Sequence, residues 1–277
     1  MEQVEYDPQA VTPCVIGAKE KLVEDETGPM VHDGDVPDGP SLDSDGQPKP
    51  EFIWTLVQIA SIWAISDIGY YLLPTLGVQS SYNESSVAIT LYYFFCAGIA
   101  VITFWPVYLT WSLYGRWTTF GSRLTSLGVW TLSFAAFTAF AAYVLPHLPP
   151  VDWKESWNPP DVRIATPSYF LPKTIEIFFQ QLLIVALVLT LATRRYSLWK
   201  ISIYCAVLFG GTHVLLALGG VPLGYVVRFM VAATVFGFVF PYLILRVPNG
   251  LAYSYIVHWL YYAASVVLPH IFAVPVK

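Results

Sequence analysis

Long apolar runs, each about the length of a membrane-crossing helix, recur along the chain from residue 52 to residue 272. A helix needs roughly 20 apolar residues to cross the hydrocarbon core of a bilayer. Residues that break helices, chiefly Pro, Gly and Asn, separate the runs. The pattern predicts seven spans, at 52–73, 87–113, 124–146, 169–193, 198–218, 221–245 and 250–272. We therefore expect an all-α, polytopic transmembrane helix bundle, with a kink in the second span at Pro106.

Composition supports a membrane protein and excludes an ordinary soluble domain. Of the 277 residues, 56% are hydrophobic and 12% are charged, whereas a typical soluble domain has about 25% charged residues. The lipid bilayer is thus the first expected partner. The sequence contains no Gly-rich phosphate loop and no dinucleotide fingerprint, and we expect no nucleic-acid partner.

The acidic residues concentrate in the N-terminal segment. Residues 1–51 contain 13 Asp and Glu against 3 Lys, while residues 52–277 contain 6 acidic against 11 basic residues. The stretch 33–50 is rich in Asp, Gly, Pro and Ser, and such a composition cannot bury enough apolar surface to fold. We predict two regions: an acidic, disordered tail at 1–51 and a transmembrane domain at 52–277.

Charge in the predicted loops indicates how the protein lies in the membrane. Basic residues follow the second, fourth and sixth spans: Arg116, Arg123, Arg194, Arg195, Lys200 and Arg246. The loops after the first and fifth spans contain no Lys or Arg. Because basic loops stay in the cytoplasm, we predict a cytoplasmic N-terminus and a C-terminus on the outside. The loop at 147–168 has mixed charge and is expected to form an interfacial cap.

Several ionisable side chains stand inside predicted spans: Asp67, Glu176, His213, Arg228 and His258. Such side chains are costly in a membrane and mark candidate functional positions. At about 1.5 Å per residue, all except His258 lie at a similar depth. One interpretation is structural, with Asp67 or Glu176 paired to Arg228. Another is catalytic, because a Glu and two His can activate a water molecule.

A divalent metal site is an alternative that the sequence neither indicates nor excludes. Glu and His are common zinc ligands, but the chain has neither an HExxH nor a CxxC motif. Cys14, Cys96 and Cys205 lie far apart and indicate no disulfide framework. His147 and His270, near helix ends, are expected to make packing hydrogen bonds.

The C-terminal half resembles the CPBP family of intramembrane proteases, which includes CAAX prenyl endopeptidases and bacteriocin-processing proteins. Phe209 and His213 form an FxxxH motif, and His258 stands where the family has its later HxxxN histidine. The resemblance covers about 169–272. It implies a CPBP-like core with Glu176, His213 and His258 as catalytic residues that cleave a peptide near the membrane.

The chain departs from the family pattern at two motifs. Where the family has EExxxR, two registers compete: Glu176 fills the first Glu position, or Gln180 and Gln181 fill both. In the second register no carboxylate remains to act as a base. Tyr262 replaces the Asn of HxxxN and offers one hydroxyl in place of an amide.

Three functions follow as alternatives. The first is a CPBP-like intramembrane endopeptidase acting on a peptide or protein substrate. The second is a catalytically inactive accessory or scaffold subunit of a membrane protein complex, or a binder of lipid or pigment. The third is an ion-coupled transporter that uses Asp67, Glu176 and Arg228, for which no inverted repeat is visible.

Overall fold

The fold is described by a computed structural model. The structure describes residues 50–79, 81–109, 120–149, 165–217 and 221–272. The predicted tail at 1–51 lies almost entirely outside these residues, as does most of the predicted cap at 147–168.

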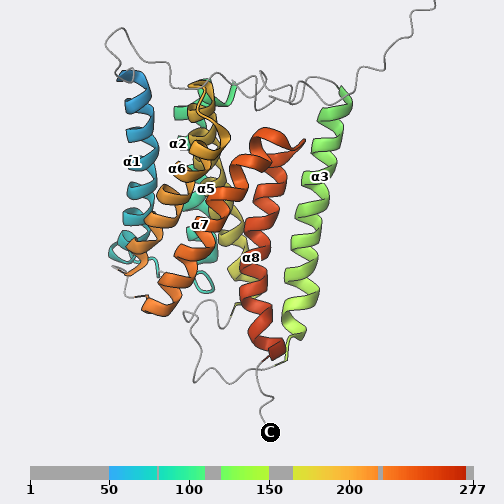
Figure 1. Ribbon diagram of the computed structural model, residues 1–277. Helices are drawn as coiled ribbons and strands as arrows, with labels where there is room; N and C mark the ends of the chain where they lie inside the picture. The colour runs from blue at the N-terminus through green and yellow to red at the C-terminus, as the bar shows by residue number, and fades with distance from the viewer. Residues whose placement is uncertain (1–49, 80, 110–119, 150–164, 218–220, 273–277) are drawn as a thin grey trace, which may run out of the picture.

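Seven helices in the described part are long and apolar enough to span a membrane, and they form one bundle (Figure 1). The helices are α1 (Pro50–Leu72), α2 (Ser86–Leu109), α3 (Phe120–Ala139), α5 (Pro167–Thr193), α6 (Leu198–Thr212), α7 (Leu223–Arg246) and α8 (Gly250–Phe272). Short turns of tighter or wider helix extend three of them: η1 (Leu73–Leu76), η3 and η4 (Phe140–Val144 and Leu145–His147), and η6 (His213–Ala217).

These helices confirm the seven predicted spans, with ends that differ by a few residues. The kink in α2 is also confirmed. Phe104 leaves the helical region, with φ −103° and ψ 15°, two residues before Pro106. Proline cannot donate to the carbonyl four residues earlier and its ring crowds that carbonyl, so the helix bends there.

Helix α5 forms the centre of the bundle. Every residue from Gln181 to Leu191 is buried, as expected for a helix that is apolar all round. Helices α1, α2, α6, α7 and α8 all contact it. Pro167 begins the helix after an extended Thr166, a position where the missing proline N–H costs nothing.

Helices α6 and α7 pack most closely, and glycines allow this approach. A Cβ atom at Gly237 would overlap the backbone of Cys205 and Ala206 on α6. At Gly210, a Cβ atom would overlap the Thr234 side chain on α7. Small residues at helix contacts are typical of membrane bundles, because close packing replaces the hydrophobic driving force.

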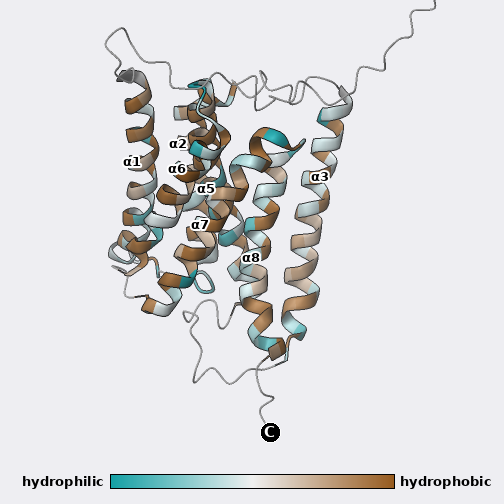
Figure 2. Ribbon diagram, in the orientation of Figure 1, coloured by the Kyte–Doolittle hydropathy of each residue, from teal (hydrophilic) through white to brown (hydrophobic). Residues whose placement is uncertain are grey.

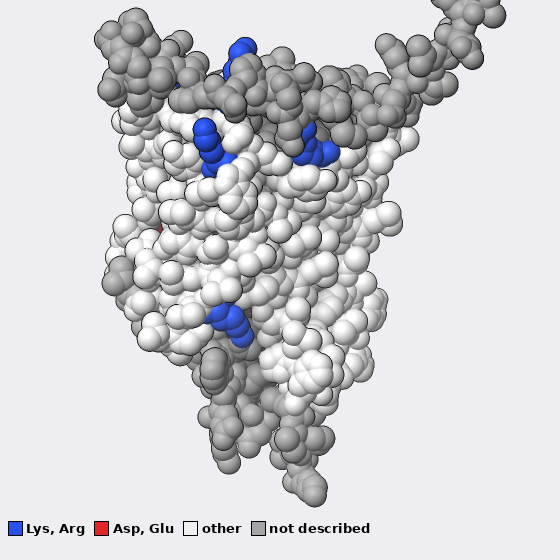
Figure 3. Space-filling view, viewed as in Figure 1, with Lys and Arg blue, Asp and Glu red and all other residues white. Residues whose placement is uncertain are grey.

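The outer surface of the bundle suits the hydrocarbon core of a bilayer. Hydrophobic residues cover the flanks of the helices (Figure 2), and side chains such as Ile102 and Leu132 are more than 70% exposed. In Figure 3, Lys and Arg appear towards the two ends of the bundle, and the band between them is almost entirely uncharged. The architecture is that of an integral membrane protein.

Candidate functional site

Four long polar side chains between Lys173 and Gln181 of α5 point into the bundle. Lys173, Glu176 and Gln180 follow one another at three- and four-residue steps, which places them on one helix face. Gln181 is adjacent. All four are buried, so this face carries an interior polar cluster.

Both oxygens of the Glu176 carboxylate accept hydrogen bonds. The Lys173 ammonium lies 2.5 Å from Oε2, and the Tyr82 hydroxyl donates to the same oxygen at 2.7 Å. Gln180 Nε2 donates to Oε1 at 3.1 Å. The Lys173 and Glu176 side chains are only 9% and 10% exposed, so this is a buried ion pair with further hydrogen bonds around the anion.

Aromatic rings enclose the Lys173 ammonium. Nζ lies 4.6 Å from the centre of the Tyr82 ring and 4.3 Å from that of Tyr262. A cation over a tyrosine face is attracted to the ring quadrupole, and more so where water is excluded. Lys173 is thus held by one carboxylate and two ring faces.

Tyr82 brings the segment between α1 and α2 into the bundle. Its hydroxyl lies 3.3 Å from that of Tyr93 on α2. Burial raises the pKa of the Tyr82 hydroxyl well above its ordinary value, and the nearby Glu176 carboxylate raises it further. Tyr82 therefore stays protonated and donates to Glu176, while Tyr93 donates to Tyr82.

A second group of polar contacts surrounds His258 on α8. Gln181 Nε2 lies 3.1 Å from His258 Nδ1, and the Ser254 hydroxyl lies 3.0 Å from Gln181 Oε1. Either orientation of the Gln181 amide is compatible with these contacts. With Nε2 towards the imidazole, Gln181 donates to Nδ1; with Oε1 towards it, a proton on Nδ1 donates to Gln181. The rings of Phe209 and Phe240 pack against the imidazole. Gln181 is thus hydrogen-bonded to one of the two ring nitrogens of His258.

His213 is the first residue of η6 and caps the end of α6. Its Nδ1 donates to the Phe209 carbonyl at 2.7 Å, since a carbonyl can only accept. The centre of the His213 imidazole lies 5.2 Å from that of the Phe209 ring, and the His258 ring lies 5.7 Å from it. Phe209 thus contacts both histidines.

Within the described residues, Glu176 forms no hydrogen bond to His213 or His258. The predicted trio lies in one region of the bundle, where the Phe209 ring contacts both imidazoles, but no direct contact joins Glu176 to either histidine. Gln180 contacts Glu176, and Gln181 contacts His258. Tyr262 covers Lys173 and packs on the His258 ring.

The predicted pairing of Asp67 or Glu176 with Arg228 is wrong. Glu176 pairs with Lys173, which lies one helical turn away on the same helix and meets the carboxylate at lower entropic cost than a residue on α7. Asp67, half-buried on α1, forms no hydrogen bond or ion pair with any residue that the structure describes.

Lys173, Tyr82 and Ser254 are functional-site residues that were not predicted from the sequence. Lys173 had a visible signal, because a Lys three residues before a Glu in a helix is a standard ion-pair spacing. Tyr82 and Ser254 had none, since their partners on α5 lie 94 and 73 residues away in sequence.

His147 and His270 make packing hydrogen bonds, as predicted. His147 Nδ1 donates to the Tyr143 carbonyl at 2.9 Å, and His270 Nδ1 donates to the Pro149 carbonyl at 2.6 Å. Where side chains are described, no three His, Cys, Asp or Glu residues gather in a way that could hold a metal ion.

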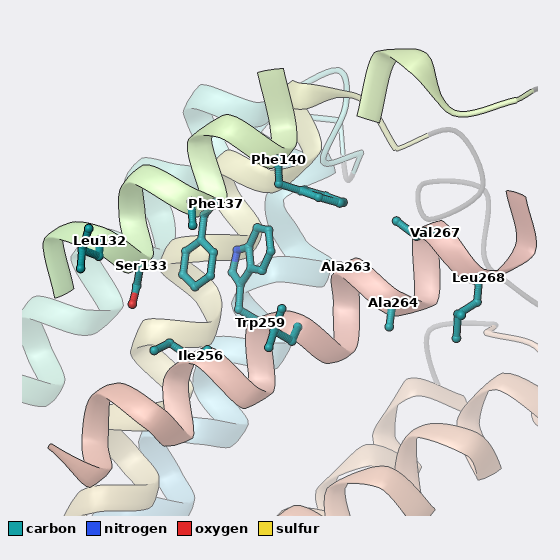
Figure 4. Close-up of a pocket in the computed structure, with 12 residues that line it drawn as sticks. Leu132, Ser133, Phe137, Phe140, Ile256, Trp259, Ala263, Ala264, Val267 and Leu268 are labelled. Carbon is teal, nitrogen blue, oxygen red and sulfur yellow. The ribbon is translucent and has the colours of Figure 1, made fainter. Parts of the chain in front are cut away.

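An apolar groove of about 640 Å³ lies between α3 and α8, away from the polar cluster (Figure 4). The rings of Phe137 and Trp259, which line the groove, stack on each other with their centres 3.9 Å apart. Its Ser133 hydroxyl is bound to the Val129 carbonyl. The Trp259 indole N–H, also in the lining, donates to the Thr174 hydroxyl, so the described residues of the groove offer no free polar side chain for chemistry.

Comparison of the chain with models of protein families, with curated proteins and with solved structures found no match.

Proposed function

We propose that this chain is a non-catalytic membrane protein, an accessory or scaffold subunit of a membrane protein complex, with a helix order like that of CPBP peptidases. The observation that carries the proposal is the pairing of Glu176 with Lys173. A general base must accept a proton from water. A carboxylate that already accepts three hydrogen bonds, one from a buried ammonium at 2.5 Å, is a poor proton acceptor.

The partners of His258 support the same proposal. Its Nδ1 is bound to Gln181, and glutamine cannot act as an acid or a base. The Gln181 amide between Ser254 and His258 joins α5 to α8, because His258 Nδ1 meets this partner only when both helices are in place. The polar cluster thus serves to hold the bundle together.

The acidic tail supports a partner-bound role. Thirteen Asp and Glu against three Lys in residues 1–51 form a segment suited to a basic surface on a neighbouring protein. A bundle held rigid by buried polar contacts could present such a segment at one membrane face.

The test compares wild type with Glu176→Gln in cells that lack the native chain. Peptide termini in the membrane fraction would be mapped by mass spectrometry, and complexes would be isolated in native lipid particles. We expect the same termini in both strains and a complex larger than the chain alone. A cleavage product present with wild type and absent with both Glu176→Gln and His213→Ala would overturn the proposal.

A second candidate function is the intramembrane endopeptidase, with Glu176 as base and His213 and His258 as partners. The observation that favours it is the position of both imidazoles beside the Phe209 ring. It requires Lys173 to release the carboxylate. Lys173→Met should then increase cleavage, whereas the scaffold function predicts no cleavage in either protein.

A further inference from the structure

Asp67 is an acidic residue of a membrane-spanning helix that pairs with no cation in the described part of the chain. It belongs to the span from Phe52 to Leu76 and lies roughly 13 Å from the end of that span at Leu76, within the hydrocarbon layer. The side chain is half-buried, and neither carboxylate oxygen belongs to the fully buried polar atoms that lack a partner. The carboxylate therefore reaches the surface of the bundle, where an unpaired charge is costly.

The cations that the structure describes are placed elsewhere. The Lys173 ammonium lies against the Glu176 carboxylate. The Arg228 guanidinium lies over the rings of Tyr225 and Phe229. The other described basic side chains stand at or just beyond helix ends: Arg123, Arg194, Arg195, Lys200 and Arg246. A counter-charge for Asp67 has to come from outside the described residues.

The face of α1 that carries Asp67 is open and suits a close contact with another helix. Helix α1 lies at the edge of the bundle (Figure 1) and packs mainly on α2 and α5. Ala60, Ala64 and Asp67 follow at four- and three-residue steps and share one face; Ala60 is exposed and Ala64 half-buried. Beside them, Ile65 and Ile68 are 66% and 58% exposed. Small residues four apart let the backbone of a second helix come close in a membrane.

We propose that this face binds a membrane-spanning helix of another protein, with a Lys or Arg side chain of that helix paired to Asp67. This assignment rests on the accessory-subunit function and specifies the partner that the function requires. A long basic side chain reaches a carboxylate on a neighbouring helix because its apolar stem lies along the intervening surface. The pair removes two isolated charges from the hydrocarbon. A second copy of this chain is unsuitable, since the same face would bring two Asp67 carboxylates together.

A model helix tests the charge pairing directly. The probe is a fluorescent Leu/Ala peptide of about 20 residues with one Lys at its centre, and its twin has Met at that position. Binding to the labelled full chain would be measured by energy transfer in phosphatidylcholine liposomes. We expect wild type to bind the Lys peptide about tenfold more tightly than the Met peptide, as one charge-assisted hydrogen bond provides. Asp67→Asn should bind the two peptides equally.

Three further variants define the site. Glu84→Gln removes an exposed carboxylate between α1 and α2 and should match wild type. Ala64→Leu keeps the charge but fills the contact, so it should weaken binding of the Lys peptide. Asp67→Lys should reverse the preference, in favour of a peptide with a central Asp. Thermal unfolding of each variant shows whether it is folded, and Ala64→Leu tests the face if the Asp67 variants do not fold.

Three results would overturn the proposal. The first is equal binding of the Lys and Met peptides by wild type, which would leave only an apolar contact. The second is an unchanged preference for the Lys peptide in Asp67→Asn. The third is energy transfer between two labelled copies of the chain that Ala64→Leu abolishes, which would assign the face to a second copy.

A basic residue of the chain itself is the remaining source of a counter-charge. Lys154, Arg163 and Lys277 lie outside the described residues. Neutralising all three should leave binding of the Lys peptide unchanged. A clear rise in binding would mean that one of them occupies Asp67, and would overturn the assignment to a partner helix.

Failure of this pairing is separable from failure of the accessory-subunit function. In complexes isolated in native lipid particles, Asp67→Asn should release the chain from the larger assembly and create no new peptide terminus. An intact assembly in Asp67→Asn would overturn the Asp67 pairing alone. A cleavage product that requires both Glu176 and His213 would overturn the accessory-subunit function, whatever the peptide binding shows.

Discussion

The Lys173 ammonium lies 2.5 Å from the Glu176 carboxylate, inside a membrane-spanning helix and only about one-tenth exposed. Neither charge could be buried alone at reasonable cost. Together, with Tyr82 on the anion and two rings around the cation, they form a neutral unit that joins α5 to the segment between α1 and α2.

Lys173→Met should destabilise the protein by about 3–5 kcal/mol, because it leaves Glu176 as an unpaired buried charge. The measurement is the free energy of unfolding in bicelles by titration with a denaturing detergent. Lys173→Met combined with Glu176→Gln should recover much of the loss, since no charge then remains. Lys200→Met, on an exposed surface of α6, is the matched control. Unchanged stability of the single variant would contradict the pairing.

Tyr82→Phe should lower stability by about 1–3 kcal/mol, the cost of removing a hydrogen bond to a buried charged group. The ring, and with it the contact to Lys173, remains. Tyr143→Phe removes a hydroxyl from a side chain that is 75% exposed and should cost almost nothing. Equal effects of the two changes would argue against a donor role for Tyr82.

Gln181→Leu should cost about 1–3 kcal/mol, because Ser254 and His258 lose a buried hydrogen-bond partner. The cost should be smaller in a His258→Phe background, where one of the two abandoned groups is absent. A double-mutant cycle measures the coupling directly. A coupling of zero would show that the contact between Gln181 and His258 contributes nothing.

The spans could be predicted from sequence because the length of an apolar run is a local property, and the Pro106 kink follows from one residue. The cluster could not be predicted fully. Lys173 lies within one turn of Glu176 and was foreseeable in principle. Tyr82 is 94 residues from Glu176 in sequence, and His258 is 77 residues from Gln181. Only the tertiary fold brings each pair into contact, and no local sequence pattern specifies these contacts.

The orientation of the chain in the membrane remains a prediction. Because Arg123, Arg194 and Arg246 lie in or beside the loops expected to be cytoplasmic, a protease cleavage site added at residue 1 should be cut from the cytoplasmic side in sealed vesicles. A site added after residue 277 should be protected there. The opposite pattern would reverse the assignment of both termini.

Gly237→Ala should destabilise the bundle although it adds one methyl group. That methyl would overlap the backbone of Cys205 and Ala206, and a backbone cannot rotate away as a side chain can, so α6 and α7 must separate. Overpacking of this kind costs about 1–3 kcal/mol. The matched control is Gly98→Ala on α2, where a Cβ atom would meet nothing within 4 Å and the better helix propensity of Ala should stabilise slightly. Unfolding in bicelles should therefore give opposite signs for two identical substitutions, and equal signs would show that α6 and α7 do not approach as closely as described.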